Sequence, residues 1–420
     1  MTQAEIAQKA AHAPSAAEES RGVAHVPGLD DATKLSKEAA QKLVRMGTIA
    51  AGVGIAATAA AYAIDHHRFG FSYLTAFAYV ATIGLGGLFF VLVQHLTRAG
   101  WSVAARRHME WVASILPWCA LLFIPVAALS GHIYHHWMAE DVDALVQAKR
   151  GYLNPTFFFI RAVVFLAIWA LLALWFGAKS RELDGKPNDA RIVNKMQAVS
   201  APSMFAFALS LTFAAFDWLM SLDPHWYSTI FGVYVFAGSV TSSLAVLALI
   251  TIALQKKGLL KKVSNVEHRH DIGKLMFAFT VFWAYIAFSQ YFLIWYANIP
   301  EETAFYKHRW EHGWKPISLI LLFTHFVIPF ILLLSRHAKR SIAGLTIGSI
   351  LLLFAHYVDM YWLVMPSAGE HGATPSLVDI LALLGPVGVA LMVIARAATK
   401  GTLFPVGDPR LAETMKLENL

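Results

Sequence analysis

Apolar residues gather along the chain in ten long runs that are separated by shorter polar stretches. Each run approaches or exceeds the roughly 20 residues with which a helix crosses the hydrocarbon core of a bilayer. The pattern therefore predicts an all-α integral membrane protein. Its ten transmembrane helices are expected at residues 46–64, 71–95, 111–130, 156–177, 201–221, 228–254, 271–298, 316–335, 341–364 and 376–395.

Polar stretches lie at both ends of the predicted membrane domain, 46–395: an N-terminal extension, 1–45, and a C-terminal tail, 396–420. Near the end of the extension, four residues recur at near-helical spacing, namely Leu35, Ala39, Leu43 and Met46. With Asp31 in front of them as an N-cap, this spacing predicts a short interfacial helix that leads into the membrane. A disordered solubilising tail is the alternative for this segment.

Composition agrees with a membrane protein and excludes a soluble one of this length. Of the 420 residues, 57% are hydrophobic and 15% are charged, and the mean hydropathy is +0.53. Average soluble domains are about 45–50% apolar and roughly 25% charged. A soluble core of this size would leave too much apolar surface for so few charges to solvate.

Lysine and arginine are distributed unevenly between the two sides of the predicted bundle. Twenty-six of them lie on the side of the termini and six on the other side, while Arg161 and Lys274 fall inside predicted spans. Because cytoplasmic loops are enriched in Lys and Arg, this bias predicts that both termini are cytoplasmic. It also explains the basic run 255–262 as a topology determinant, so we expect no nucleic-acid partner.

Cysteine and histidine usage limits the cofactors that the chain can hold. The single cysteine, Cys119, excludes an internal disulfide, a four-cysteine iron–sulfur cluster and a C-x-x-C-H haem attachment. Two histidine groups have spacings that metal sites use, namely His132, His135 and His136, and His308 and His312. Neither group is accompanied by cysteines or converging carboxylates, so we predict no metal site. We interpret these histidines as part of a solvent-exposed surface that contacts a partner protein. If the protein handles electrons, the metal centres belong to other chains.

Four charged residues fall in the outer half of the predicted spans, namely Arg161, Asp217, Asp359 and Asp379. Each is costly in a membrane and needs a partner or a function. With His132 just beyond a helix end, Arg161, Asp217 and Asp359 form a candidate site for a ligand that carries protons, because a buried carboxylate beside a cation can accept a proton. The alternative is a structural ion pair between Arg161 and either Asp217 or Asp359.

Polar residues that continue deeper into the membrane domain predict a proton path. Its members are Asp217, Lys274, Tyr285, His325, His356 and Asp359. His356 and Asp359 share one helix face, and His325 lies mid-membrane on the eighth span. Two alternatives stay open: the histidines hydrogen-bond neighbouring groups, or His325 and His356 ligate a haem b.

Two stretches are specific enough to indicate a family: FDWLMSLDPHWYSTIFGVYVFAG (216–238) and DIGKLMFAFTVFWAYIAFSQYFLIWYANIPEET (271–303). Together with the ten-helix plan, they resemble the NrfD-like membrane subunits of bacterial alternative complex III, of the ActF type, over about residues 40–400. The resemblance implies the NrfD-like fold, with two four-helix bundles and one helix flanking at each end. It also implies a place in the bacterial cytoplasmic membrane.

The function that this resemblance implies is that of a subunit of a quinol:cytochrome c, or quinol:oxidase, oxidoreductase. Such a subunit binds menaquinone or ubiquinone near the periplasmic face and holds no covalently bound cofactor. Electrons would leave through periplasmic iron–sulfur and haem c subunits, and a paralogous NrfD-like subunit and a terminal oxidase are further expected partners. By position, His132 and Asp217 are the expected quinone-pocket residues. Arg161 and Asp359 are added to the pocket because they lie at a similar depth in the membrane.

Because the paralogous subunit has the better-supported pocket in this family, other functions stay open. One is a proton-conducting or scaffold subunit without a working quinol site. Another, from a different class, is a free-standing secondary transporter, for which the proline-interrupted spans are also typical.

Overall fold

The computed structural model describes residues 33–369 and 373–418, and all regular structure within these ranges is helical. Ten helical stretches are long and apolar enough to cross a membrane, and each overlaps one predicted segment. The predicted number and order of spans are therefore confirmed for the described residues. The ten stretches are Lys37–Ile64, His66–Leu96, Val103–Ala128, Pro155–Asp184, Ala190–Leu222, Phe231–Lys256, Val266–Ala297, Lys315–Leu334, Ile342–Ala368 and Leu377–Thr399.

Six of these spans are single helices, and two more end in a short 3-10 turn. The single helices are α3 (Lys37–Ile64), α4 (His66–Leu96), α11 (Pro155–Asp184), α13 (Phe231–Lys256), α14 (Val266–Ala297) and α20 (Leu377–Thr399). The two that end in a turn are α12 (Ala190–Trp218), followed by η2 (Met220–Leu222), and α19 (Ile342–Val364), followed by η4 (Met365–Ala368).

The third and eighth spans are broken, and prolines lie at the breaks. The third consists of α5 (Val103–Ala113), α6 (Leu116–Leu122) and α7 (Ile124–Ala128), with Pro117 and Pro125 in the first turns of α6 and α7. The eighth consists of α16 (Lys315–Leu322), the π-helical turn η3 (Phe323–Val327) and α17 (Ile328–Leu334), in which Pro329 follows the π turn. Proline removes a helix hydrogen bond and crowds the preceding turn, which explains these positions. The π turn carries His325, and such turns are frequent at functional sites.

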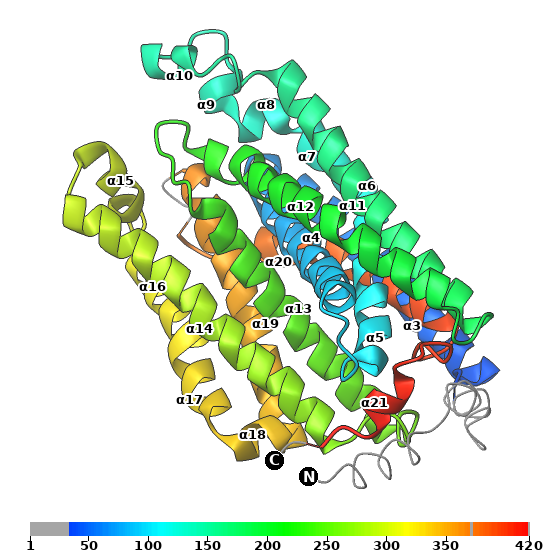
Figure 1. Ribbon diagram of the computed structural model, residues 1–420. Coiled ribbons are helices and arrows are strands. Elements are labelled where there is room, and N and C mark those ends of the chain that lie inside the picture. Colours follow the sequence, from blue (N-terminus) through cyan, green and yellow to red (C-terminus); the bar gives the residue numbers. More distant parts are fainter. Residues whose placement is uncertain (1–32, 370–372, 419–420) are drawn as a thin grey trace, which may run out of the picture.

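Helix packing divides the ten spans into two sets of four and one pair (Figure 1). The second to fifth spans pack around one another, the sixth to ninth do the same, and α4 packs on α13 between the two sets. These two central helices are the most enclosed, because 83% and 78% of their apolar stretches are buried. The first and last spans, α3 and α20, pack mainly on each other, and α20 also packs on α4.

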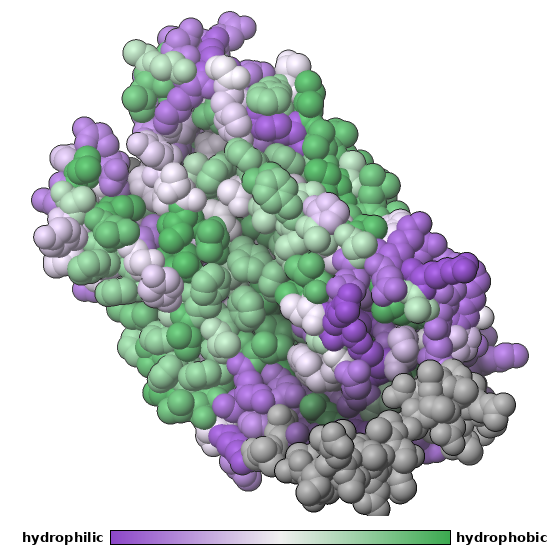
Figure 2. All heavy atoms as spheres, in the orientation of Figure 1, coloured by the Kyte–Doolittle hydropathy of each residue, from purple (hydrophilic) through white to green (hydrophobic). Residues whose placement is uncertain are grey.

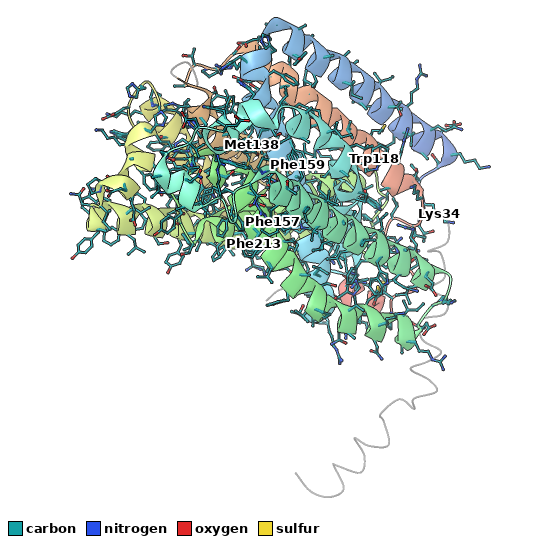
Figure 3. All side chains as sticks on the ribbon, turned by 90° about the horizontal axis from the view of Figure 1, so that it is seen from above. Lys34, Trp118, Met138, Phe157, Phe159 and Phe213 are labelled. Carbon is teal, nitrogen blue, oxygen red and sulfur yellow. The ribbon has the colours of Figure 1, made fainter. Side chains whose placement is uncertain are left out.

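Glycine allows α3 and α20 to pack closely at the edge of the molecule, where Figure 3 shows them side by side. A Cβ atom on Gly54 would lie 2.2 Å from the carbonyl oxygen of Leu384, and one on Gly388 would lie 2.4 Å from that of Ala50. No side chain fits at these distances, so both crossing points require glycine. Close backbone approach of this kind favours association of membrane helices through van der Waals contact.

Polar surface gathers at the two ends of the bundle, and Figure 2 shows a mostly hydrophobic surface between them. Because the number of spans is even, α3 begins and α20 ends at the same end, which we call the terminal face. It also carries α18 (Arg336–Arg340) and α21 (Leu411–Met415). The other end, the opposite face, carries α8 (Ser130–Ile133), α9 (His135–Met138), α10 (Ala144–Ala148) and α15 (Pro300–His308).

Helix α3 begins at Lys37 and continues without a break to Ile64. Ser36 is its N-cap, and the Ser36 hydroxyl accepts a hydrogen bond from the Ala39 N–H at 3.2 Å. Residues 37–45 are therefore the first turns of the first span rather than a separate interfacial helix. The predicted cap, Asp31, lies outside the described residues.

Candidate functional site

Arg161 of α11 and Asp217 of α12 form a buried ion pair toward the opposite face. Nε and Nη2 of Arg161 donate to the two carboxylate oxygens of Asp217 at 2.6 and 3.1 Å. A third donor, Nη1, reaches the carbonyl oxygen of Tyr152 at 3.0 Å, and the Asp217 side chain is fully buried. Of the two ion pairs that the sequence left open for Arg161, the structure contains the one with Asp217. A bidentate pair of this kind is strong and fixes the relative orientation of the two helices.

The local sequence places both charges close to the ends of their helices. Helix α11 begins with Asn154 as its N-cap and Pro155 in its first turn, so Arg161 lies in the second turn. The guanidinium carbon of Arg161 lies 3.9 Å from the ring centre of Tyr152 and 4.2 Å from that of Phe157. Aromatic faces attract a cation, and Asp217 neutralises it. The pair is therefore a charge-balanced site that closes one end of the α11–α12 interface.

A cavity of about 310 Å³ lies beside this ion pair. Tyr152, whose ring covers Arg161, borders the cavity, and so does Ser221, whose hydroxyl donates to the Asp217 carbonyl oxygen at 2.5 Å. The other aromatic and charged lining residues are Phe216, Trp226, Tyr227, Lys149 and Asp223. Small-molecule sites are typically about 300–1,000 Å³ and combine apolar walls with a few polar groups. The cavity meets this description at the lower end of the size range, with Tyr152 and Ser221 between it and the ion pair.

Two polar contacts hold the walls of the cavity together at the opposite face. Nε2 of His225 lies 2.6 Å from a carboxylate oxygen of Asp143, and Nζ of Lys149 donates to the Pro224 carbonyl at 2.5 Å. Asp143 also caps α10. A hydrogen bond from the Val146 N–H has the largest effect on its carboxyl and one from His225 the next largest, and both hold its pKa below the ordinary value. Both contacts join the α10 side of the cavity to the segment that follows η2.

Arg309 lies behind the cavity on the opposite face, outside the spans, and is 5% exposed. Its donors reach the carbonyl oxygens of Phe305, Trp362 and Leu363, each at 3.1 Å. Burial lowers the pKa of Arg309 to about 9, and nearby Asp223 opposes that shift. Phe305 stacks on Arg309 and also on Trp226 of the cavity wall, with ring centres 3.9 Å apart in the second contact. Arg309 thus fixes α15 against the end of α19 and supports this wall.

Asp359 of α19 belongs to a different buried group, the Asp359 cluster, which consists of Thr82, Tyr234, Trp283, His325, His356 and Asp359. The Tyr234 hydroxyl donates to one carboxylate oxygen, and the Trp283 indole N–H donates to the other at 3.0 Å. Nδ1 of His325 lies 3.8 Å from that second oxygen, and the His325 ring stacks on Trp283 with centres 3.8 Å apart. The π turn η3 therefore presents His325 to a carboxylate that is held by neutral donors.

His356 lies one helical turn before Asp359, and the two side chains border the same small residue. A Cβ atom on Gly238 of α13 would lie 3.2 Å from the His356 ring and 3.5 Å from Asp359. Nε2 of His356 is 2.8 Å from the Thr82 hydroxyl of α4. His356 therefore hydrogen-bonds a neighbouring hydroxyl, which was one of the alternatives that the sequence left open. The cluster joins the centre of the molecule, α4 and α13, to α14, η3 and α19.

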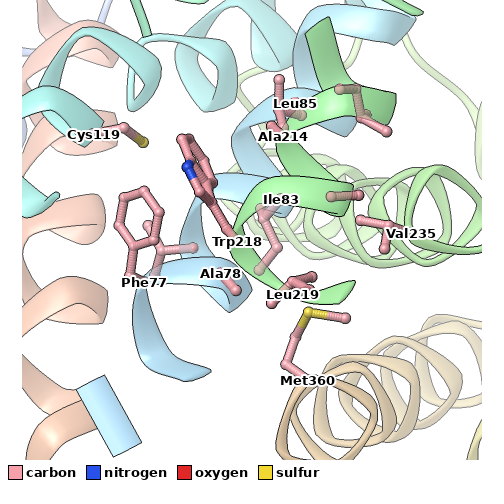
Figure 4. Packing of buried hydrophobic residues seen from close by; sticks show 14 of the residues in the cluster. Phe77, Ala78, Ile83, Leu85, Cys119, Ala214, Trp218, Leu219, Val235 and Met360 are labelled. Atoms are coloured by element: carbon pink, nitrogen blue, oxygen red, sulfur yellow. The ribbon is translucent and has the colours of Figure 1, made fainter. Parts of the chain in front are cut away.

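Apolar side chains separate the ion pair from the Asp359 cluster. Trp218, which follows Asp217, and Thr82, which contacts His356, both border a cavity of only about 30 Å³. The rest of its lining is almost entirely apolar, and Figure 4 shows Trp218 among Phe77, Ala78 and Leu219. The structure therefore places Arg161 and Asp217 in one buried polar site and Asp359 in another, rather than all three around one cavity.

Three predicted site residues lie apart from both groups. His132 is half-buried at the opposite face, where its Nε2 lies 2.9 Å from the His67 carbonyl oxygen. Lys274 forms an ion pair with Asp271 at 2.5 Å near the start of α14, and Tyr285 is 65% exposed on the outside of that helix. The third intramembrane acid, Asp379, pairs with Arg68 through contacts of 2.8 and 2.7 Å and joins α20 to α4.

Residues that were not predicted from the sequence also contact the ion pair or the Asp359 carboxylate, among them Tyr152, Ser221, Tyr234 and Trp283. All four are common types in membrane helices or at their ends, and no spacing pattern distinguishes them. Ser221, Tyr234 and Trp283 lie inside the two family-like stretches, 216–238 and 271–303, which was the available signal.

Within residues 33–369 and 373–418, no group of three or more His, Cys, Asp or Glu side chains is arranged to hold a metal ion. Comparison with known proteins adds no assignment: no protein-family model matches the chain, and no curated protein matches it.

Proposed function

We propose that the chain is an NrfD-like membrane subunit of a quinol:cytochrome c, or quinol:oxidase, oxidoreductase and that it contributes a quinone pocket. The observation that carries the proposal is the cavity of about 310 Å³ beside the buried Arg161–Asp217 pair. Aromatic walls suit a planar quinone ring. The carboxylate behind Tyr152 and Ser221 suits a reaction that releases protons.

The proposed orientation puts the opposite face, and with it the cavity, on the periplasmic side of a bacterial cytoplasmic membrane. Its support is the excess of Lys and Arg on the side of the termini. The two sets of four spans, with α3 and α20 outside them, support the NrfD-like arrangement that the two sequence stretches imply.

Oxidation of a quinol releases two electrons and two protons. In our proposal one proton passes from a quinol hydroxyl to the Asp217 carboxylate by way of the Tyr152 hydroxyl, the other passes to water at the opposite face, and Arg161 keeps the carboxylate charged before it accepts its proton. Both electrons leave to iron–sulfur and haem c groups on periplasmic partner subunits. A paralogous NrfD-like subunit and a terminal oxidase complete the proposed assembly, with menaquinone or ubiquinone as the substrate.

A photoreactive quinone analogue tests the pocket in the intact complex. Labelled peptides should cover residues 148–153 or 216–227, and Asp217→Asn should lower quinol oxidation about 100-fold. The matched control is Asp379→Asn, which alters an arginine-paired acid that does not border the cavity and should keep the labelling. Labelling confined to a partner subunit would contradict the proposal.

The Asp359 cluster favours a second candidate function, proton conduction without a quinol site in this chain. Its carboxylate and two histidines are fully buried and lie at the junction of α4, α13, α14, η3 and α19. If this function is correct, Asp359→Asn lowers the number of protons released per electron in reconstituted vesicles and leaves quinol oxidation unchanged. An unchanged proton ratio would exclude it.

A free-standing secondary transporter predicts a different result. The purified chain would then show solute-dependent transport by itself. Co-purification in a fixed ratio with haem c and iron–sulfur proteins would argue against a transporter and for the proposed complex.

A further inference from the structure

The segment after the last span, residues 402–414, folds back across the terminal face, and we call it the C-terminal strap. Three of its buried apolar residues, Leu403, Phe404 and Leu411, pack with Val103, Ala104, Trp111, Leu260 and Val263. Polar contacts fasten it at several points: Asp408 pairs with Arg106, Arg410 donates to the Arg98 carbonyl oxygen, and Thr414 donates to that of Trp101. The strap thus joins α5 to the loop before α14.

Beneath the strap lies a network of buried charged side chains from α5 and α11. Arg107 donates to both carboxylate oxygens of Asp184 at 2.9 and 3.0 Å, and to the Ser180 hydroxyl at 3.1 Å. Arg106, Arg107, His108 and Glu110 are consecutive or nearly so on α5, and each is at most 7% exposed. Thr402 of the strap closes the network with a hydrogen bond of 2.9 Å to Asp184.

This network is incompletely hydrogen-bonded. Of the seventeen buried side-chain nitrogen and oxygen atoms in the described residues that have no aligned hydrogen-bond partner, seven are here. They are Nε2 of His95, Nε of Arg106, Nε of Arg107, both ring nitrogens of His108 and both carboxylate oxygens of Glu110. Glu110 lies 3.1 Å from Arg107 Nε and close to the Ser180 hydroxyl, and His108 lies close to the Leu403 backbone, but none of these contacts has hydrogen-bond alignment. Buried polar groups in this condition weaken the closed state, because water would satisfy them.

We propose that the C-terminal strap is a latch, closed in this structure, whose opening gives water on the terminal face access to Glu110 and His108. Contributions of opposite sign to the stability of the closed strap support this proposal. Burial of Leu403, Phe404 and Leu411 and the Asp408–Arg106 pair favour the closed state. Hydration of the seven atoms beneath favours the open state. The strap also bonds to both sets of four spans, through Arg98 after α4 and through His268 of α14, which lies 3.3 Å from Thr414, so its opening depends on their relative position.

Two glycines, Gly401 just before the strap and Gly407 within it, provide a matched test. A Cβ atom on Gly407 would lie 1.9 Å from the Leu183 carbonyl oxygen, which is backbone and cannot yield, so Gly407→Ala must lift the strap. A Cβ atom on Gly401 would lie 3.4 Å from Arg107 Nη1, an ordinary contact, so Gly401→Ala should leave it in place. The readout is labelling of Glu110 by a water-soluble carbodiimide and a charged amine, located by mass spectrometry, with amide hydrogen exchange of residues 403–411 measured in parallel.

We expect Gly407→Ala to raise both strap exchange and Glu110 labelling by about 10-fold or more, because overpacking of this kind is strongly destabilising. Gly401→Ala should match the wild type. Asp408→Arg, which opposes Arg106 with a like charge, is a second way to release the strap. The proposal is overturned if strap exchange rises without labelling of Glu110, if the strap stays protected in both variants, or if wild-type Glu110 is labelled as fast as the exposed Glu38.

Discussion

Asp217 and Asp359 are both fully buried acids in membrane-spanning helices, but their surroundings differ in kind. Asp217 has a bidentate arginine as its partner, and the cation is itself covered by Tyr152 and Phe157. Asp359 has the hydroxyl of Tyr234 and the indole of Trp283, with His325 at 3.8 Å. The Asp217 carboxylate is therefore neutralised by an arginine, whereas the Asp359 carboxyl group is surrounded by neutral hydrogen-bond donors and a histidine.

This difference separates two uses of a carboxylate. A buried ion pair has a fixed geometry, and removing either of its two partners is strongly destabilising. An acid among neutral donors can keep an added proton, because no partner is left with an uncompensated charge. A proton on Asp217 leaves the Arg161 charge uncompensated, so in our proposal Asp217 passes it on rather than holds it. We therefore expect the two sites to respond differently to matched substitutions.

The largest effect should follow from Arg161→Gln. It removes the cation, leaves Asp217 buried without a counter-charge and empties the space between Tyr152 and Phe157. The expected loss of unfolding free energy is about 3–5 kcal/mol. Unfolding in mixed micelles of mild detergent and dodecyl sulfate measures it.

The double variant Arg161→Gln with Asp217→Asn tests the reason for that loss. It should recover a large part of the stability, because no unpaired charge remains. A double variant as unstable as the single one would show that packing around the guanidinium, and not charge balance, dominates at this site.

A smaller loss, about 1–2 kcal/mol, is expected for Asp359→Asn. The amide keeps an acceptor for Tyr234 or Trp283 but not for both, and no cation is stranded. The same unfolding measurement compares it with Asp217→Asn, which strands Arg161. Equal losses in the two asparagine variants would remove the distinction between the sites.

Trp283→Phe isolates one donor of the Asp359 cluster. The phenyl ring keeps an aromatic face for His325 but loses the 3.0 Å hydrogen bond to Asp359. Hydrogen bonds between membrane helices average about 0.6 kcal/mol and reach about 1.7, and we expect a loss in this range. No change in stability would mean that Tyr234 alone holds the carboxylate.

The smallest effect should come from Thr82→Val, which removes the 2.8 Å contact to His356 at nearly constant volume. A loss of about 0.5 kcal/mol is expected in the unfolding assay. The size of this loss is informative. A loss of unfolding free energy as large as that of Asp359→Asn would show that His356 and Asp359 are energetically coupled.

Much of the membrane architecture could be predicted because apolar run length alone determines a span. Helix α13 is long, apolar and free of competing signals, and α20 is apolar enough to be predicted although Pro386 lies inside it. The start of α3 was not predicted, because residues 37–45 are polar enough to resemble an extension although no helix breaker separates them from the span. The breaks in the third and eighth spans follow their prolines, but the π turn at His325 has no sequence signature.

The site was less predictable because depth along a helix does not specify which helices are neighbours. Arg161, Asp217 and Asp359 lie in the same predicted outer half, and only packing assigns Arg161 to Asp217 and Asp359 to Tyr234 and Trp283. His356 and Asp359 were correctly placed on one face, because their spacing lies within a single helix. Contacts within a helix could be derived from sequence, whereas contacts between helices could not.

The glycine-mediated contact between α3 and α20 has a consequence for biogenesis. Helix α3 leaves the ribosome long before its main partner, α20, has been made, because more than three hundred residues separate the two. At synthesis rates of about 5–20 residues per second, that delay is on the order of tens of seconds. During this time the surface around Gly54 faces lipid or an insertion factor, so a chain that stalls before α20 leaves this surface uncovered.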